Sequence, residues 1–315
     1  YAGISVGKAR QFLQQTDRLI KTVPEVDTVF GKVGRADTAT DPAPLTMIET
    51  IIRFKPKDEW RAGMTKAKIK RELESLIDFP GVSNAWVMPI KTRIDMLSTG
   101  IKTPVGIKIA GPDLDRIQEI GQQLESILDE LPGTASVYSE RVAGGRYITV
   151  DVDRRRAARH GLNIDDVHQV IRTAIGGTNL TETVEGLERY PVNMRYPSRY
   201  RDSPESLRQL PLVTDKGRRI ALGQVAEVRI ESGPPMIKSE NARLNGWTLV
   251  DIEGVDLGTY VGRAQKAVTE ELDLPAGYAL QWSGQYEYMQ RAKEKLAWVV
   301  PLTVLVIALL LFANF

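Results

Sequence analysis

The sequence predicts an α+β fold of repeated strand–helix–strand units, with an inserted α+β domain and a C-terminal transmembrane helix. Three observations support this prediction. A helix followed by proline and then a strand occurs four times along the chain. A long stretch with different elements interrupts the repeats at residues 146–235. The last residues, 298–315, contain no charged side chain.

Each copy of the repeat carries an amphipathic helix that ends where proline prevents its continuation. The copies are residues 10–31, 69–87, 117–139 and 260–284. In the third copy, apolar residues recur at helical spacing: Ile117, Ile120, Leu124, Ile127, Leu128 and Leu131. Strands precede the last three copies, at residues 45–56, 105–111 and 246–254. Two such units form a split βαβ, or ferredoxin-like, sandwich.

The repeats divide the chain into two subdomains. The first two copies form one subdomain at residues 1–101, and the last two form another at residues 102–145 and 236–290. The first helix has no preceding strand, so we expect that strand just upstream of Tyr1. The chain therefore reads as an internal fragment of a larger membrane protein.

The insert at residues 146–235 reads as a small α+β domain. Its expected elements are a strand at 146–153, two helices at 154–177 with a turn at Gly161 and a cap at Asn163 and Asp165, a hairpin at 178–197 turning at Gly186, and a strand pair at 210–230 turning at 215–217.

The apolar C-terminal segment predicts a truncated transmembrane helix at residues 296–315, because about 20 apolar residues span a bilayer. We expect Pro301 in its first turn, where the missing N–H costs little. A buried helix of a soluble protein is the alternative, but residues 304–312 have no polar face.

Composition excludes several functions. A net charge of +2 gives no electrostatic basis for nucleic-acid binding, and acidic neighbours offset the basic run at residues 154–156. The chain has no cysteine, which excludes disulfides and thiolate metal sites. Its two histidines, His160 and His168, lie too far apart to suggest a zinc site.

Met47 and Met96 stand among polar and charged residues. A thioether in such surroundings is a soft-metal ligand and points toward Cu(I) or Ag(I). We expect Met47 on a strand beside Glu49, and Met96 in a polar loop between two strands. The alternative is that each methionine packs on its own subdomain.

Four charged residues accompany the two methionines: Asp41, Glu49, Arg93 and Lys102. They could balance the charge of a cation or bind protons during its release. Surface ion pairs, which contribute little energy, are the alternative. No acid–base partner stands at a defined spacing, so an enzyme is not expected.

Five segments together resemble a known transporter family: residues 31–50, 93–109, 144–162, 183–204 and 239–247. They are similar to the heavy-metal efflux branch of the resistance–nodulation–division (RND) transporters, of the CusA/SilA type that exports monovalent copper and silver. The resemblance covers essentially the whole chain.

The resemblance implies an architecture and a location. The chain would be the second periplasmic loop of a bacterial inner-membrane protein, with residues 1–290 in the periplasm. Its parts would be the porter subdomains PC1 (1–101) and PC2 (102–145 and 236–290), a docking domain (146–235) and the eighth transmembrane helix. The implied partners are two further copies in a homotrimer, a periplasmic membrane-fusion adaptor, an outer-membrane channel and the lipid bilayer, with no nucleic acid.

The resemblance also implies a site of three methionines in the cleft between PC1 and PC2. Two of them match Met47 and Met96, and the third would lie just before Tyr1. Asp41, Glu49, Arg93 and Lys102 match charged residues of that cleft. Copper or silver would be the cargo of a proton antiporter with no cofactor. Exporters of divalent metals or drugs, and a non-transporting scaffold, remain alternatives.

Overall fold

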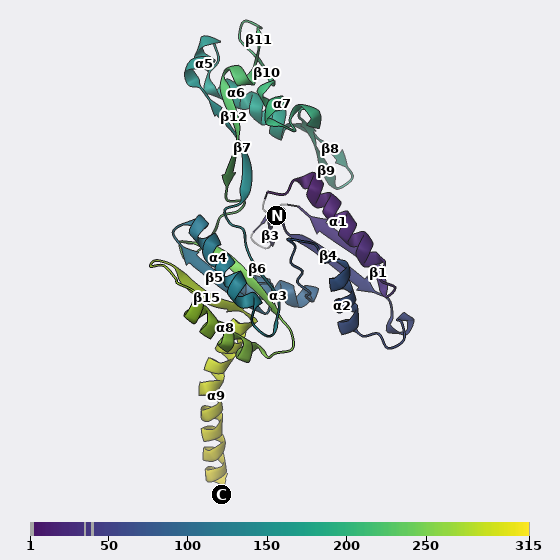
Figure 1. The fold of residues 1–315 in the computed structure, drawn as a ribbon, viewed down its shortest axis with the longest axis vertical. Coiled ribbons are helices and arrows are strands. Elements are labelled where there is room, and N and C mark those ends of the chain that lie inside the picture. Colours follow the sequence, from purple (N-terminus) through teal and green to yellow (C-terminus); the bar gives the residue numbers. More distant parts are fainter. Residues whose placement is uncertain (1–2, 35, 39–40, 315) are drawn as a thin grey trace. The chain divides into compact units, whose positions relative to one another are not determined.

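The computed structural model describes the backbone of residues 3–34, 36–38 and 41–314, and their side chains except at 36–38 and 41–42. They form two compact units, Tyr1–Gly145 with Pro234–Phe315, and Arg146–Gly233. Each unit combines helices with antiparallel sheets (Figure 1). The expected α+β class is confirmed.

The first part of the larger unit is a helix-covered strand pair. Its elements are α1 (Val6–Lys21), β1 (Val26–Val33), β4 (Ile48–Phe54) and α2 (Lys66–Leu76). β1 and β4 pair antiparallel, and a short hairpin of β2 (Ala36–Thr38) and β3 (Asp41–Ala43) lies between them in the chain. The helices bury one apolar stripe each against the strands, including Ile20 and Leu73.

The strand expected at the end of the second repeat does not form. Residues 82–88 have no strand assignment. In a split βαβ sheet the last strand pairs with the first, and no strand precedes α1 among residues 3–5. Without that neighbour, the backbone of residues 82–88 has no ladder to join.

The second part of this unit is a complete ferredoxin-like sandwich. Its elements are β5 (Val105–Gly111), α4 (Leu114–Asp129), β6 (Thr134–Ser139), β14 (Arg243–Ile252), α8 (Leu257–Glu271) and β15 (Ala279–Gly284). The sheet order is β6–β14–β5–β15, and every neighbouring pair is antiparallel. The short strand β13 (Lys238–Glu240) pairs with the first residues of β14, whose later residues pair with β6.

The two faces of this sheet differ in chemistry. Val105, Ile107 and Ile109 of β5 are fully buried in the core that α4 and α8 cover. The alternate residue Lys108 faces the other way, beside Trp247 of β14. This second face therefore carries a charged side chain beside an aromatic ring.

The smaller unit has its own apolar core, which includes Ala157, Val167, Leu207 and Leu222. Its elements are β7 (Gly145–Val152), α5 (Arg154–Arg159), α6 (Ile164–Ile171) with a π turn to Gly176, β8 (Thr178–Glu185), β9 (Glu188–Met194), α7 (Pro204–Arg208), β10 (Pro211–Val213), β11 (Arg219–Ala221) and β12 (Ala226–Gly233).

The cap of α6 differs in one residue from the expectation. Asn163 accepts a hydrogen bond from the Asp166 N–H (3.0 Å), and the Asp166 carboxylate accepts one from the Asn163 N–H (2.8 Å). Asp166 rather than Asp165 is therefore the partner in this capping box, because only the third helical position can reach back to the cap.

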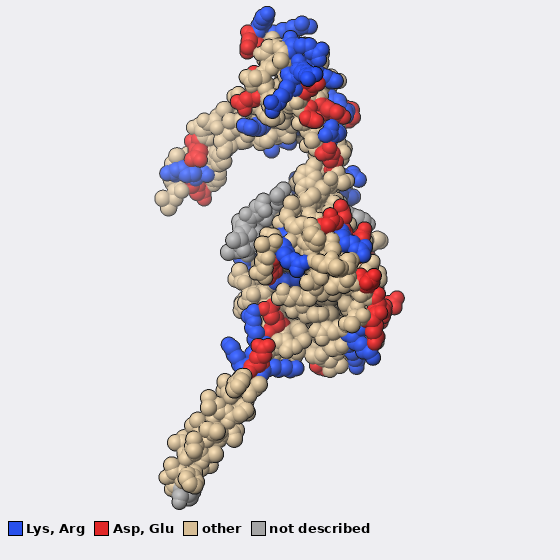
Figure 2. Space-filling model, turned by 90° about the vertical axis from the view of Figure 1, so that its left-hand side faces the viewer, with Lys and Arg blue, Asp and Glu red and all other residues tan. Residues whose placement is uncertain are grey.

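The last helix, α9 (Gln285–Asn314), is one continuous element. It is long and apolar enough to cross a membrane, with a mean hydropathy of 2.7 over its most apolar window. Figure 2 shows no charged side chain on the visible face of its C-terminal part. Pro301 lies inside this helix and not in its first turn, because residues 285–297 are already helical. The carbonyl of residue 297 therefore lacks its usual donor.

Candidate metal-binding site

Met47 lies in the turn that leads into β4, one residue before the strand begins. Its N–H donates to the carbonyl of Pro44 (3.0 Å) and closes that turn. The side chain is half-buried. Its Sδ atom lies 2.7 Å from Nζ of Lys102, which donates to the sulfur. Met47 was expected on the strand itself, so this expectation was wrong by one position.

Met96 lies on a helix, α3 (Pro89–Thr99), and not in the expected loop. Proline is well placed at the first position of the helix, where its missing N–H is not needed. Gly100 ends the helix in the left-handed conformation (φ 80°), and its N–H donates to the carbonyl of Met96 (2.9 Å). Both signals, Pro89 and Gly100, are present in the sequence.

The sequence pattern of α3 does not indicate an ordinary amphipathic helix, because this helix buries polar side chains and exposes apolar ones. Asp95 and Thr99 are buried, with 6% and 4% of their surface exposed. Ile94 and Leu97 are mostly exposed instead. A helix normally buries its apolar stripe. Met96 itself is half-buried.

The structure brings Lys102 against Met47 and places Met96 on the helix that leads into Lys102. The connection is short, because Gly100 and Ile101 alone separate the end of α3 from Lys102. Met47 and Lys102 are therefore in direct contact, and Met96 belongs to the same short segment as Lys102.

The other charged candidates have different surroundings. Glu49 pairs with Lys32 (3.2 Å) across the β1–β4 ladder, as in the surface ion-pair alternative. Arg93 is exposed on α3, three residues before Met96. The backbone of Asp41 begins β3, but its side chain lies outside the described residues.

Two contacts hold α3 in place. At its end, Gly100 lies against the ring of Trp247 on β14, and a Cβ at Gly100 would be 2.9 Å from the ring atom Cη2. Near its middle, the buried Asp95 carboxylate pairs with Lys91 (2.8 Å) and accepts from Nε2 of Gln285 (3.4 Å), the first residue of α9.

Trp247 belongs to a charged cluster on the polar face of the sheet, which the sequence reasoning missed. The Nζ atom of Lys238 lies 3.7 Å from the centre of its ring, a cation–π contact. Lys238 also pairs with Glu140, and the buried Lys108 pairs with Glu240 (3.0 Å). Lys108 and Trp247 are direct partners in the β5–β14 ladder. Each lysine of the cluster has a carboxylate partner, which buried charges require.

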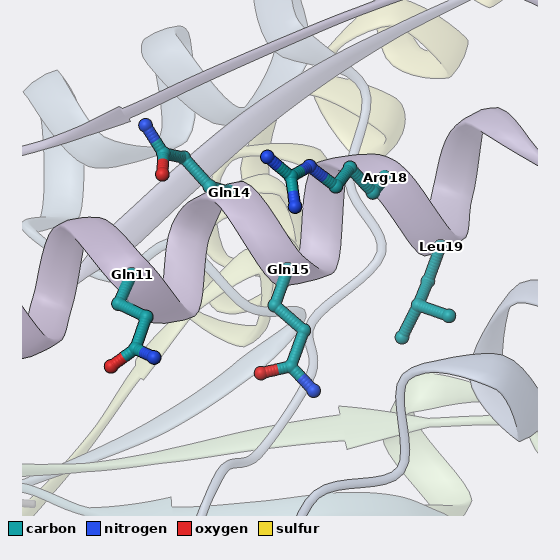
Figure 3. A pocket seen from close by; sticks show the side chains of 5 residues that line it. All are labelled: Gln11, Gln14, Gln15, Arg18 and Leu19. Atoms are coloured by element: carbon teal, nitrogen blue, oxygen red, sulfur yellow. The ribbon is translucent and has the colours of Figure 1, made fainter.

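Other polar features of this unit do not resemble a metal site. A shallow hollow on α1 is lined by Gln11, Gln14, Gln15, Arg18 and Leu19 (Figure 3). These side chains offer amides and a guanidinium, which are poor ligands for soft metals. Over the described ranges 3–34, 36–38 and 41–314, no three His, Cys, Asp or Glu residues form a group that could hold a metal ion.

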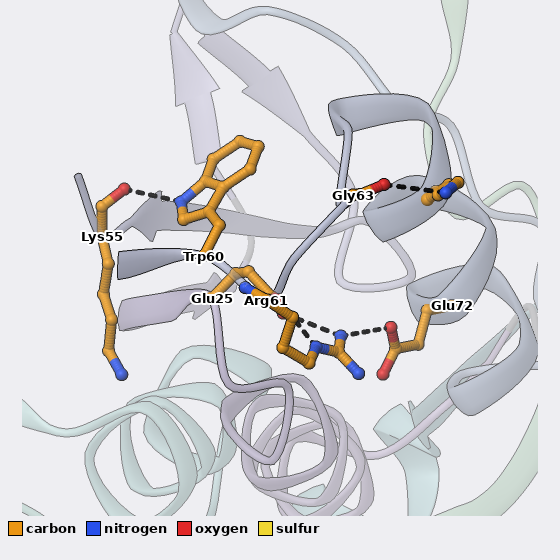
Figure 4. Close-up of polar contacts among 7 residues, drawn as sticks. Glu25, Lys55, Trp60, Arg61, Gly63 and Glu72 are labelled. Carbon is orange, nitrogen blue, oxygen red and sulfur yellow. Dashed lines mark hydrogen bonds and ion pairs between the residues drawn. The ribbon is translucent and has the colours of Figure 1, made fainter. Parts of the chain in front are cut away.

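The strongest electrostatic feature near β1 is an ion pair between a buried carboxylate and a half-exposed arginine. Glu25 is fully buried and accepts from Nε and Nη2 of Arg61 (2.7 and 2.8 Å), which also pairs with Glu72 (Figure 4). Hydrogen bonds from Arg61 lower the pKa of Glu25 to about 2, although burial opposes this shift. The pair ties the segment after β4 to the start of β1, which is a structural role.

The chain belongs to the AcrB/AcrD/AcrF family of transporters, whose model matches residues 1–315. It is 48% identical to the cation efflux system protein CusA of Escherichia coli (strain K12) over 99% of its length. It is also 48% identical, over 99% of its length, to the putative cation efflux system protein SilA of Salmonella typhimurium. The resemblance to heavy-metal efflux RND transporters is thereby confirmed.

A solved structure gives the same result for the fold. The crystal structure of a heavy metal efflux pump superposes on 98% of this chain with a TM-score of 0.89 and 29% sequence identity. The chain covers 33% of that structure and 30% of the length of the two curated relatives. It therefore spans about a third of the length of these proteins.

Proposed function

We propose that this chain is the second periplasmic part, with the start of a transmembrane helix, of an inner-membrane pump that exports Cu(I) or Ag(I) in exchange for protons. The observation that carries the proposal is the sulfur of Met47, which already contacts a cationic group (2.7 Å) next to the segment that bears Met96. A half-buried, neutral thioether is suited to bind a soft metal ion.

The chemistry of thioethers supports a monovalent soft cargo. A thioether has no proton to lose, so its affinity for metal depends less on pH than that of a thiolate. Neutral sulfur ligands hold Cu(I) and Ag(I) well and hold hard Mg²⁺ or Ca²⁺ poorly. The copper or silver ion is the cargo in this proposal, and no resident cofactor is required.

The architecture supports a transport role. The split of the larger unit into two apolar cores fits two porter subdomains, PC1 at residues 1–101 and PC2 at residues 102–145 and 236–290. The metal would bind where PC1 and PC2 meet and leave toward an outer-membrane channel. The insert, residues 146–235, would serve as the docking domain for that channel and a periplasmic adaptor in a trimeric pump.

The test replaces the two sulfurs in the protein expressed from its complete gene. Met47→Ile and Met96→Ile should each weaken binding of Ag(I), measured by titration of the purified protein, and reduce silver resistance of the host. Met194→Ile is the matched control, because Met194 is half-exposed on β9 in the other unit. Unchanged resistance in both site variants would show that the assignment is wrong.

A divalent-metal exporter is the competing function. The same purified protein, titrated with Zn(II) and Ag(I), separates the two. Tight Zn(II) binding with no Ag(I) binding contradicts a copper or silver pump. A scaffold without transport is contradicted by silver accumulation in cells that lack the gene and its reversal when the gene is restored.

A further inference from the structure

The contact between Lys102 and Met47 is unusual in its chemistry. A thioether sulfur is a weak hydrogen-bond acceptor. Yet the Lys102 ammonium contacts Sδ of Met47, across 55 positions of sequence. The sulfur electron pair that would bind a metal ion is therefore directed at a charge of the same sign as the cargo.

We propose that Lys102 competes with the transported ion for the Met47 sulfur, so that the ammonium and the metal occupy this atom in turn. This inference rests on the proposed function. Lys102 thereby weakens binding at equilibrium and speeds release of the metal. It is a release device and does not act as a ligand.

The backbone around Lys102 favours movement of the side chain alone. Ile101 is fully buried, and Thr103 is 3% exposed with its hydroxyl bonded to the carbonyl of Val105 (2.7 Å). The two neighbours hold the main chain of Lys102 in place. The lysine side chain has four rotatable carbon–carbon bonds, so its ammonium can leave the sulfur without a change of fold.

The exchange is a simple replacement of one partner by another. When the metal arrives, a metal–sulfur bond forms and the N–H···S hydrogen bond breaks, while the ammonium keeps all its protons. Two positive charges then lie close together and repel each other. When the ammonium returns to the sulfur, the metal loses this ligand and can leave. A thioether suits such exchange, because its bond to either partner needs no proton transfer.

The experiment uses the protein from its complete gene, purified in detergent, with Ag(I) as the probe. Lys102→Leu removes the charge and keeps the apolar length of the side chain. We expect it to bind Ag(I) roughly tenfold more tightly, because one like charge is removed from the site. Dissociation of Ag(I) into a competing chelator should slow by a similar factor. Lys102→Arg, which keeps the charge, should stay near the unsubstituted protein.

Controls separate this effect from folding and from general charge. Lys266→Leu removes an exposed lysine on α8 and should leave Ag(I) affinity unchanged. Lys102→Gln is a second neutral variant in case the leucine destabilises the fold, and thermal melting monitors both. In a Met47→Ile background, Lys102→Leu should no longer tighten binding.

The outcomes distinguish this inference from the proposed function. If the unsubstituted protein binds Ag(I) with no dependence on Met47, the metal site itself is wrong. If binding depends on Met47 but both neutral variants bind equally or more weakly, competition by Lys102 is overturned. The same holds if the tightening persists at full size without Met47, because Lys102 then acts only as a distant charge.

Discussion

The indole ring of Trp247 packs against Gly100, the left-handed residue that ends α3. A Cβ at Gly100 would approach Cη2 of the ring to 2.9 Å. The same glycine donates its N–H to the carbonyl of Met96. One residue therefore connects the polar face of the sheet to the helix that carries a candidate ligand, and this connection sets the position of Met96.

Gly100→Ala should destabilise the protein and weaken Ag(I) binding. The left-handed conformation costs an alanine about 1 kcal/mol, and the collision with Trp247 adds to this cost. Gly254→Ala is the matched control, because Gly254 has a similar φ (74°) but open space around it. Thermal melting should show a larger loss for Gly100→Ala. Equal losses and equal affinities in the two variants contradict a positioning role for the Trp247 contact.

Glu25→Gln should lower stability at neutral pH and flatten its acid dependence. The folded-state pKa of Glu25 is about 2, against an ordinary value of 4.5. Because folding lowers this pKa, the stabilisation is complete above pH 4.5 and is lost as the pH falls toward 2. Arg61 is 44% exposed, so solvent screens the pair and the loss is smaller than for a pair that is buried on both sides. Denaturant unfolding from pH 7 to pH 3 measures both effects, and Glu270→Gln, in an exposed pair on α8, should change neither.

Asp95→Ala should loosen α3. The buried carboxylate holds Lys91 and Gln285, and its removal leaves the amide of Gln285 without this acceptor. A loss of about 1–2 kcal/mol is expected. Hydrogen exchange of the α3 amides should quicken, while α4 stays unchanged. Glu119→Ala, which breaks an exposed pair on α4, is the comparison. Unaltered exchange in α3 contradicts the role of Asp95 as an anchor.

Leu309→Arg should reduce membrane insertion of α9. A charged residue near the centre of a transmembrane helix costs about 3 kcal/mol, and Leu309 is 59% exposed on this helix. An insertion assay of residues 285–314 in a reporter protein gives the inserted fraction. Gln290→Arg, in the polar first part of α9, should insert as the unsubstituted segment does. Equal insertion of both variants indicates that α9 does not cross the bilayer.

The sequence predicted the elements whose apolar residues follow the period of their own structure. The helices α4 and α8 and the strand β5 lie where their patterns indicate. The helix α3 was not predicted, because its polar side chains are buried and its apolar side chains are exposed. The strand expected after the proline of the second repeat, within residues 69–87, does not form for a different reason, since a strand needs a neighbour and no local pattern supplies one.

The candidate site was predictable only in part. Polar surroundings singled out Met47 and Met96, but the contact between Met47 and Lys102 joins residues 55 apart. Such a contact depends on the tertiary fold and has no periodic signal. The contact between Gly100 and Trp247 also depends on the tertiary fold, because Gly100 caps α3 and Trp247 lies on β14.

The insert begins after β6 and ends before β14. These two strands lie side by side in one sheet. Its first and last strands, β7 and β12, are hydrogen-bonded to each other, so the two crossings are about 5 Å apart. A tight hairpin turn could close the same gap. The insert is therefore attached through one pair of strands, and a tight turn in its place would leave the sheet and the apolar core of the larger unit uninterrupted.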